Sequence, residues 1–224
     1  MMIVGYVFAL FIMIYYIYRP HLNAFTTLGW KTCSSLCFLT IGILWMLMNH
    51  HTFGTWMVVG LFMGLMGDVF LNLTPCYPKK ETLWFLMGLG SFLIGHLAYV
   101  YALYRTSILY SVLLIIGCAF VSFILLLFLQ RKNFISLQEM FLPAFVYATV
   151  ILFFEMQCLV WLFDQIQVFT IVLNIGSMLF VLSDLILLFI LFGDKDTKTM
   201  TRMNLTTYYL AQMCLATTIL LYKA

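Results

Sequence analysis

The chain has 224 residues and a net charge of +3, and 65% of its residues are hydrophobic whereas only 8% are charged. Soluble domains carry about 25% charged residues, so this composition excludes a protein whose surface faces water on all sides. The longest basic runs are the pairs Lys79-Lys80 and Arg131-Lys132, which argues against a nucleic-acid-binding surface.

Apolar runs separated by polar or turn residues predict eight membrane-spanning helices, because a bilayer core of about 30 Å needs roughly 20 apolar residues per helix. In chain order, the predicted helices are Met2–Tyr18, Cys33–Met48, Gly54–Leu73, Leu83–Tyr104, Ile108–Leu129, Gln138–Phe163, Val168–Phe192 and Thr206–Tyr222. The short connecting segments leave no room for a soluble domain. We therefore predict an all-α, polytopic membrane protein in which residues 1–224 form a single transmembrane domain.

The basic residues are distributed unevenly over the two ends of these helices. The segments after the first, third, fifth and seventh helices contain Arg19, Lys31, Lys79, Lys80, Arg131, Lys132, Lys195, Lys198 and Arg202. The opposite ends contain only Arg105 and Lys223. The positive-inside rule places the first set in the cytoplasm, and therefore both termini on the non-cytoplasmic side. The expected membrane is the bacterial inner membrane or, in a eukaryote, the endoplasmic reticulum.

Ionisable side chains inside a bilayer are energetically expensive, and they are therefore candidates for function. The predicted spans contain Asp68, His96, Glu155 and Asp184. At 1.5 Å per residue, Asp68 and Asp184 lie roughly 8 Å and 12 Å from the cytoplasmic ends of their helices. Tyr147 and Gln212 lie at similar depth, and His96 lies nearer the outer side.

The helical spacing of these residues predicts that they face the interior of the bundle. Gly60 and Gly64 precede Asp68 at four-residue intervals, and small residues allow a neighbouring helix to approach closely. Other sets share a helical face in the same way: Asn174, Ser177, Val181 and Asp184; Phe92, His96 and Tyr99; Tyr147 and Glu155; and Tyr208 and Gln212.

Each of these residues also has a purely structural interpretation. An intramembrane Asp can simply hydrogen-bond a neighbouring helix, His96 can be a packing residue, and Glu155 can face the outer headgroups. Ser183 has no strand–turn–helix elbow around it, so a structural role is the better interpretation than a nucleophile. Convergence favours function, because two carboxylates, a His, a Gln and several tyrosines come from five helices.

The segments that contain these residues resemble the lysoplasmalogenase family, also called YhhN-like membrane proteins. The similar segments are GDVFL (Gly67–Leu71), GLGSFLIGHLAY (Gly88–Tyr99), Tyr147, GSMLFVLSD (Gly176–Asp184) and YYLAQ (Tyr208–Gln212). Lys31, expected before the second helix, resembles a basic residue that the family carries there. The resemblance implies an eight-helix bundle with an active site between the helices. It also implies a lysophospholipid substrate, whose vinyl ether bond is hydrolysed to a fatty aldehyde and glycerophospho-ethanolamine or glycerophosphocholine.

Vinyl ether hydrolysis begins with slow protonation of a carbon atom, which requires a positioned general acid. Two carboxylates in a low-dielectric site can share one proton at neutral pH. We therefore expect Asp68 and Asp184 to form a catalytic pair. The residues expected to bind or orient substrate or water are His96, Tyr99, Tyr147, Ser183, Tyr208, Gln212 and Lys31. We expect neither a cofactor nor a metal, because no ligand spacing indicates a metal site.

Three other classes of function use similar residues. A proton-coupled membrane transporter, the main alternative, would use the same carboxylates as a relay, but it typically has inverted repeats or broken helices. An intramembrane aspartyl protease would typically have Gly in place of Met66 in GLMGD. A non-catalytic scaffold would need no convergent carboxylates.

Overall fold

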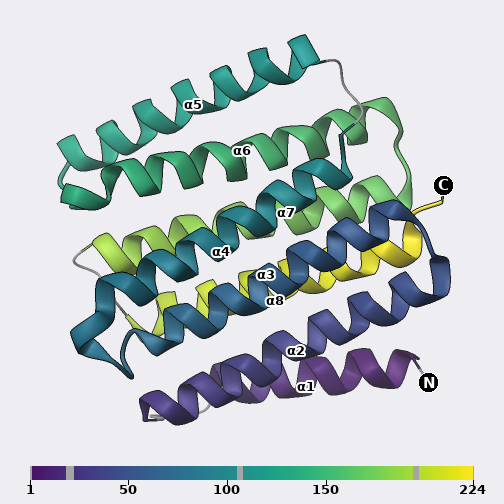
Figure 1. Cartoon of the computed structure of the whole chain (residues 1–224), viewed down its shortest axis with the longest axis horizontal. Coiled ribbons are helices and arrows are strands. Elements are labelled where there is room, and N and C mark those ends of the chain that lie inside the picture. Colours follow the sequence, from purple (N-terminus) through teal and green to yellow (C-terminus); the bar gives the residue numbers. More distant parts are fainter. Residues whose placement is uncertain (1, 19–22, 105–107, 194–196, 224) are drawn as a thin grey trace. The chain divides into compact units, whose positions relative to one another are not determined.

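The computed structural model describes residues 2–18, 23–104, 108–193 and 197–223. These residues form the helices shown in Figure 1: α1 (Met2–Tyr18), α2 (Ala24–Asn49), α3 (Thr52–Leu73), α4 (Glu81–Ala102), α5 (Ile108–Arg131), α6 (Phe141–Asp164), α7 (Val168–Phe192) and α8 (Lys198–Leu221). Two short 3₁₀ helices, η1 (Pro78–Lys80) and η2 (Gln138–Met140), precede α4 and α6. The described part of the chain contains no β-strand.

The predicted fold class is confirmed, because the described residues form a helical, multi-pass membrane protein. Six helices, α2 to α7, are long and apolar enough to cross a membrane. In α1, the apolar segment Gly5–Tyr18 is shorter than these six spans. Helix α8 is less apolar than the others, so eight membrane crossings stay a prediction. Arg19, Arg105 and Lys195, on which the predicted orientation partly depends, lie outside the described residues.

Five helix starts differ from the prediction, and those of α2 and α8 differ most. Helix α2 begins at Ala24 instead of Cys33, because the Asn23 side chain accepts a hydrogen bond of 2.8 Å from the Thr26 amide and so caps the helix. Helix α8 begins at Lys198 instead of Thr206, and the Thr197 hydroxyl accepts from the Met200 amide at 3.1 Å. The expectation that Lys31 precedes the second helix is therefore wrong, since Lys31 lies inside α2.

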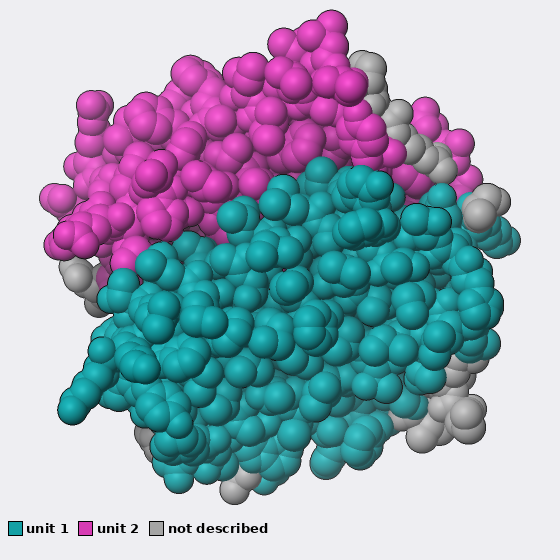
Figure 2. Space-filling model, viewed as in Figure 1, with its two compact units in different colours: residues 1–102, 212–224 teal, residues 103–211 magenta. Residues whose placement is uncertain are grey.

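The chain divides into two compact units, which Figure 2 shows in different colours. Unit 1 contains residues 1–102 and 212–224, and unit 2 contains residues 103–211. Helix α8 therefore contributes its first part to unit 2 and its last part to unit 1. The single transmembrane domain predicted for residues 1–224 stays a prediction.

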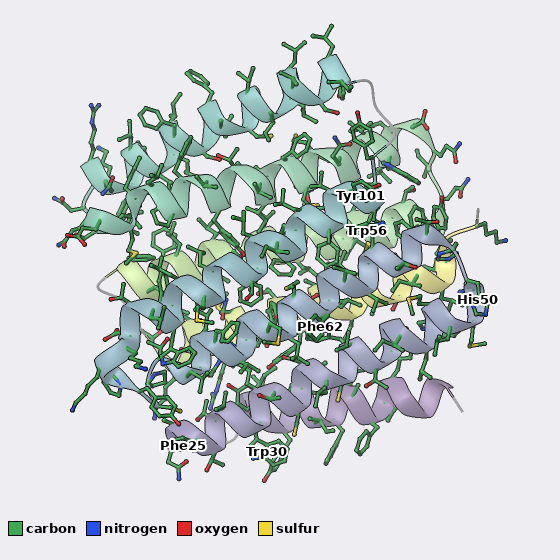
Figure 3. All side chains as sticks on the ribbon, in the orientation of Figure 1. Phe25, Trp30, His50, Trp56, Phe62 and Tyr101 are labelled. Carbon is green, nitrogen blue, oxygen red and sulfur yellow. The ribbon has the colours of Figure 1, made fainter. Side chains whose placement is uncertain are left out.

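In unit 1, glycines bring α3 and α4 close together. A Cβ atom on Gly60 would overlap the ring of Tyr99, and one on Gly67 would overlap the ring of Phe92. At the end of the same helix pair, the rings of Trp56 and Tyr101 lie 4.5 Å apart between centroids (Figure 3). Small residues on α3 therefore fix the positions of aromatic side chains on α4, as is common between membrane helices.

In unit 2, an apolar cluster packs the ends of α5, α6 and α7 together. Its buried members are Leu126, Leu129, Ile135 and Leu137, and partly buried phenylalanines of α6 and α7 pack against them. The Ser136 amide donates a hydrogen bond of 2.8 Å to the Phe192 carbonyl, which ties the segment before α6 to the end of α7. These contacts hold the start of α6 against the end of α7.

Candidate functional site

Asp68 lies on α3 and is 1% exposed. One of its carboxylate oxygens, Oδ2, accepts a hydrogen bond of 2.5 Å from the Ser35 hydroxyl. The other, Oδ1, lies 3.2 Å from the Lys31 ammonium. We call Lys31, Ser35 and Asp68 the Asp68 cluster. A buried carboxylate needs an opposite charge and hydrogen-bond donors to offset the loss of water, and α2 supplies both.

The sequence analysis missed Ser35 and did not anticipate the ion pair of Lys31. Both residues lie on α2, one helical turn apart, so their side chains share a face. The signal was present in this four-residue spacing, but the predicted helix began after Lys31. Had Asn23 been recognised as an N-cap, the spacing would have placed both residues on one face of the helix.

A second group in unit 1 consists of His96, Tyr99 and Gln212, all of which are buried. The Tyr99 hydroxyl donates a hydrogen bond of 3.2 Å to the Gln212 side-chain oxygen. The His96 Nδ1 atom lies 2.8 Å from the Phe92 carbonyl. Because a carbonyl can only accept, Nδ1 carries a proton. The rings of His96 and Tyr99 meet edge to face at 5.9 Å, so the structure places these three predicted site residues in one polar group.

In unit 2, Tyr147 of α6 and Asp184 of α7 form a hydrogen bond, in which the tyrosine hydroxyl donates to the carboxylate Oδ2. Both side chains are half-buried. Their helices are adjacent and antiparallel neighbours in the chain, joined by a short connection at Gln165–Gln167. The pairing of Tyr147 with Asp184 holds the carboxylate at the α6–α7 interface.

Ser183 is held by Asn204, a residue of α8 that the sequence analysis did not select. The Asn204 side-chain amide donates to the Ser183 carbonyl at 2.7 Å and to the Ser183 hydroxyl at 3.0 Å. Ser183 is 1% exposed and adjoins Asp184 in the chain, so Asn204 fixes the backbone beside that carboxylate. Asn204 was missed because the prediction assigned it to a loop before the last helix. Tyr208, also buried, packs its ring edge against the ring of Phe180.

The predicted site residues therefore fall into sets within each unit. Unit 1 contains Lys31, Asp68, His96, Tyr99 and Gln212, and unit 2 contains Tyr147, Ser183, Asp184 and Tyr208. The expected pair of Asp68 and Asp184 has one member in each unit and stays a prediction. Within the described ranges, no three His, Cys, Asp or Glu side chains come together as metal ligands. A surface pocket in unit 2, lined by residues 136–140 and 191–193, contains none of the predicted site residues.

Glu155 does not face the outer headgroups, which was its alternative interpretation. It lies on α6 with 7% of its surface exposed, beside Ser177 on α7. Its Oε2 atom has no hydrogen-bond partner among the described residues. Unit 2 therefore holds a second buried carboxyl group on the same helix pair as Asp184.

In a comparison with protein families, the model of the YhhN family matches residues 26–219. No curated protein and no solved structure matches the chain. Because the match spans most of the chain, the protein belongs to the YhhN family, which is the lysoplasmalogenase family. The resemblance found in the sequence is thereby confirmed.

Proposed function

We propose that this member of the YhhN family is a membrane-embedded hydrolase that cleaves the vinyl ether bond of lysoplasmalogens. The observation that carries the proposal concerns the two aspartates in the segments that resemble the family. Asp68 accepts a hydrogen bond from Ser35, and Asp184 accepts one from Tyr147. Each carboxyl group is therefore held in one orientation among apolar helices, which is what acid catalysis at a lipid substrate requires.

The reaction consumes one water molecule. A general acid gives its proton to the β-carbon of the vinyl ether, which leaves an oxocarbenium ion. Water adds to the carbon next to the ether oxygen and loses a proton to a carboxylate, which gives a hemiacetal. The hemiacetal collapses to a fatty aldehyde, and the glycerol oxygen leaves as a hydroxyl group with the remaining proton. Lipid and water supply every atom, so the mechanism assigns no step to a cofactor.

We assign different roles to the two aspartates. Asp68 forms an ion pair with Lys31, so we assign to it the role of the anionic carboxylate that stabilises the cation and accepts the proton of water. Asp184, oriented by Tyr147, is then the proton donor. Two carboxyl groups in different environments commonly divide acid and base roles in this way.

The other predicted residues support this chemistry in the proposal. His96, Tyr99 and Gln212 form a polar group that can orient the glycerol part of the substrate, and Tyr208 and Ser183 help to position Asp184 and its surroundings. The single acyl chain of the lysolipid would lie among the apolar helices in the bilayer. Lys79 and Lys80, which are exposed in η1, are candidate contacts for the lipid phosphate. The type of membrane and the non-cytoplasmic termini remain part of the proposal.

The test is an assay of the purified protein in detergent for aldehyde release from lysoplasmenyl-ethanolamine. Asp184→Asn and Asp68→Asn are each expected to lower kcat by about 10²–10⁴-fold, the usual contribution of a general acid or base. Asp164→Asn is the matched control, because Asp164 is exposed at the end of α6. The control is expected to keep full activity.

Asp68→Asn leaves Lys31 without its ion-pair partner and can fail to fold. The double variant Lys31→Met with Asp68→Asn removes both charges and keeps the test valid for a folded protein. A wild-type protein that releases no aldehyde from vinyl ether or other lysolipids would overturn the proposal, and so would folded aspartate variants with wild-type activity. In the first case, proton-coupled transport is the next function to test, because the buried Glu155 carboxyl group also suits a proton relay.

A further inference from the structure

Polar side chains follow one face of α7 from its beginning to Asp184. Thr170, Asn174, Ser177 and Asp184 are separated by four, three and seven residues. At 3.6 residues per turn, these separations place all four on a single helical face. The face has one apolar position, Val181. We call the four residues the polar column.

Helix α6 adds polar side chains to the column at two levels. At the level of Ser177, whose hydroxyl donates to the Asn174 carbonyl at 3.0 Å, the Glu155 carboxyl group and the Cys158 thiol of α6 lie beside α7. At the level of Asp184, Tyr147 donates its hydroxyl hydrogen bond. Polar groups of both α6 and α7 therefore lie along the column.

Two buried polar atoms, one on the column and one on α6 beside it, have no hydrogen-bond partner in the described part of the chain. They are Oε2 of Glu155 and Nδ2 of Asn174, and their side chains are 7% and 6% exposed. Glu155 also has no cationic partner among the described residues. Buried polar groups are almost always hydrogen-bonded, to protein or to water. One of these atoms accepts and the other donates, so the molecule that suits both is one that can donate and accept, as water does.

The column begins at a polar helix connection. The Thr170 hydroxyl donates to the Gln165 carbonyl at 2.7 Å, and Gln165 and Gln167 are exposed in the connection between α6 and α7. Asn174 lies roughly 9 Å from the start of α7, and Asp184 lies about 15 Å further along the helix. The column therefore joins an exposed end of unit 2 to the predicted proton donor.

We propose that the polar column is a water path that leads from the α6–α7 connection to the reaction site at Asp184, with water held between Glu155 and Asn174. This inference rests on the proposed function, because hydrolysis consumes one water per turnover in a site surrounded by apolar helices. Glu155, Asn174 and Ser177 act as positioning residues for water and do not touch the lipid.

Hydroxyl-radical footprinting of the full chain in detergent tests for water at the column. Radicals form from water next to a side chain, and sulfur atoms react readily. Cys158 is 0% exposed and faces the column, whereas Cys118 is 5% exposed on α5, outside it. We expect Cys158 to be oxidised about tenfold faster than Cys118 despite its deeper burial.

Asn174→Leu fills the polar position with an apolar side chain of similar size and is expected to lower the oxidation of Cys158 to the rate of Cys118. The same variant is expected to lower kcat for aldehyde release about tenfold with an unchanged KM, because lipid binding is not altered. Asn174→Ser keeps a hydrogen-bonding group, so this variant is expected to keep the wild-type oxidation rate of Cys158 and the wild-type kcat. Ile175→Leu is the matched control on the exposed face of α7, with both values unchanged.

Equal oxidation of Cys158 and Cys118 in the wild type would overturn the water path. Unchanged oxidation of Cys158 in a folded Asn174→Leu variant would overturn it as well. The footprinting result does not depend on activity. If Cys158 behaves as expected but the protein releases no aldehyde from any lysolipid, the proposed function fails and the water-filled column stands.

Discussion

Two regions of the molecule each bury a carboxyl group, but the two groups differ in their hydrogen-bond and ion-pair partners. In unit 1, Asp68 has partners for both oxygens, the Ser35 hydroxyl and the Lys31 ammonium. In unit 2, Glu155 reaches one hydroxyl group and keeps an oxygen without a partner among the described residues. The two side chains are almost equally buried, at 1% and 7% exposure, so the difference lies in their partners and not in their burial.

A membrane helix bundle can therefore use one type of group for two purposes. A carboxylate with a partner for each oxygen stays in one orientation and holds two helices together. A carboxyl group with an unused oxygen can bind a small polar molecule, at a cost in stability when that molecule is missing. Three sets of substitutions test how the side chains of the two units are held.

The largest effect is expected for Asp68→Asn, which leaves the Lys31 ammonium buried without its counter-charge. Breaking a buried ion pair from one side typically costs about 3–5 kcal/mol of unfolding free energy. Thermal or denaturant unfolding in detergent measures the loss. The double variant Lys31→Met with Asp68→Asn is expected to recover most of it. Equal stability of the single variant and the wild type would show that Asp68 does not depend on the pair.

A smaller effect separates two buried serines. Ser35→Ala removes the donor to the Asp68 carboxylate and is expected to cost about 1.5–3 kcal/mol of unfolding free energy, as hydrogen bonds to charged groups do. Ser122 of α5 is also buried, but its hydroxyl has no partner within the described ranges. Ser122→Ala is therefore expected to be neutral or slightly stabilising. Similar losses in the two variants, measured by the same unfolding assay, would contradict the contrast.

The third prediction concerns packing. A methyl group at Gly60 would overlap the Tyr99 ring, so Gly60→Ala is expected to cost about 1–3 kcal/mol of unfolding free energy. It should also disturb the Tyr99–Gln212 hydrogen bond. Gly117 of α5 has open space at the same atom, and Gly117→Ala is expected to add about 0.5–1 kcal/mol through helix propensity. A Gly117→Ala variant that is less stable than the wild type would contradict this open space and show that α5 is packed more tightly at Gly117.

The helix ends show how far local sequence information extends. The bounds predicted for α1 and α7 are those of the structure, because both helices begin and end with apolar residues. The starts of α2 and α8 were predicted too late, because each begins with a polar turn that an apolar-run criterion excludes. The capping residues Asn23 and Thr197 define those starts, and they were visible in the sequence to a criterion based on capping.

The site shows the same division at longer range. Most of the site residues could be selected from the sequence, because polar groups are rare and energetically expensive in membrane-spanning helices. They are Asp68, His96, Tyr99, Tyr147, Ser183, Asp184, Tyr208 and Gln212. The sequence did not indicate Ser35 or Asn204, which are short polar residues of a kind that occurs in any helix. Their importance comes from partners that lie 33 and 21 positions away in the chain.

The sequence by itself determined that the protein is an all-helical membrane protein of the lysoplasmalogenase family, since hydrophobic runs and family segments are properties of the chain alone. Only the tertiary structure decided which polar groups meet: Lys31 and Ser35 with Asp68, Asn204 with Ser183, and Tyr147 with Asp184. The physical reason is that a helix satisfies its own backbone from local residues, whereas a buried side chain depends on whichever helix packs against it.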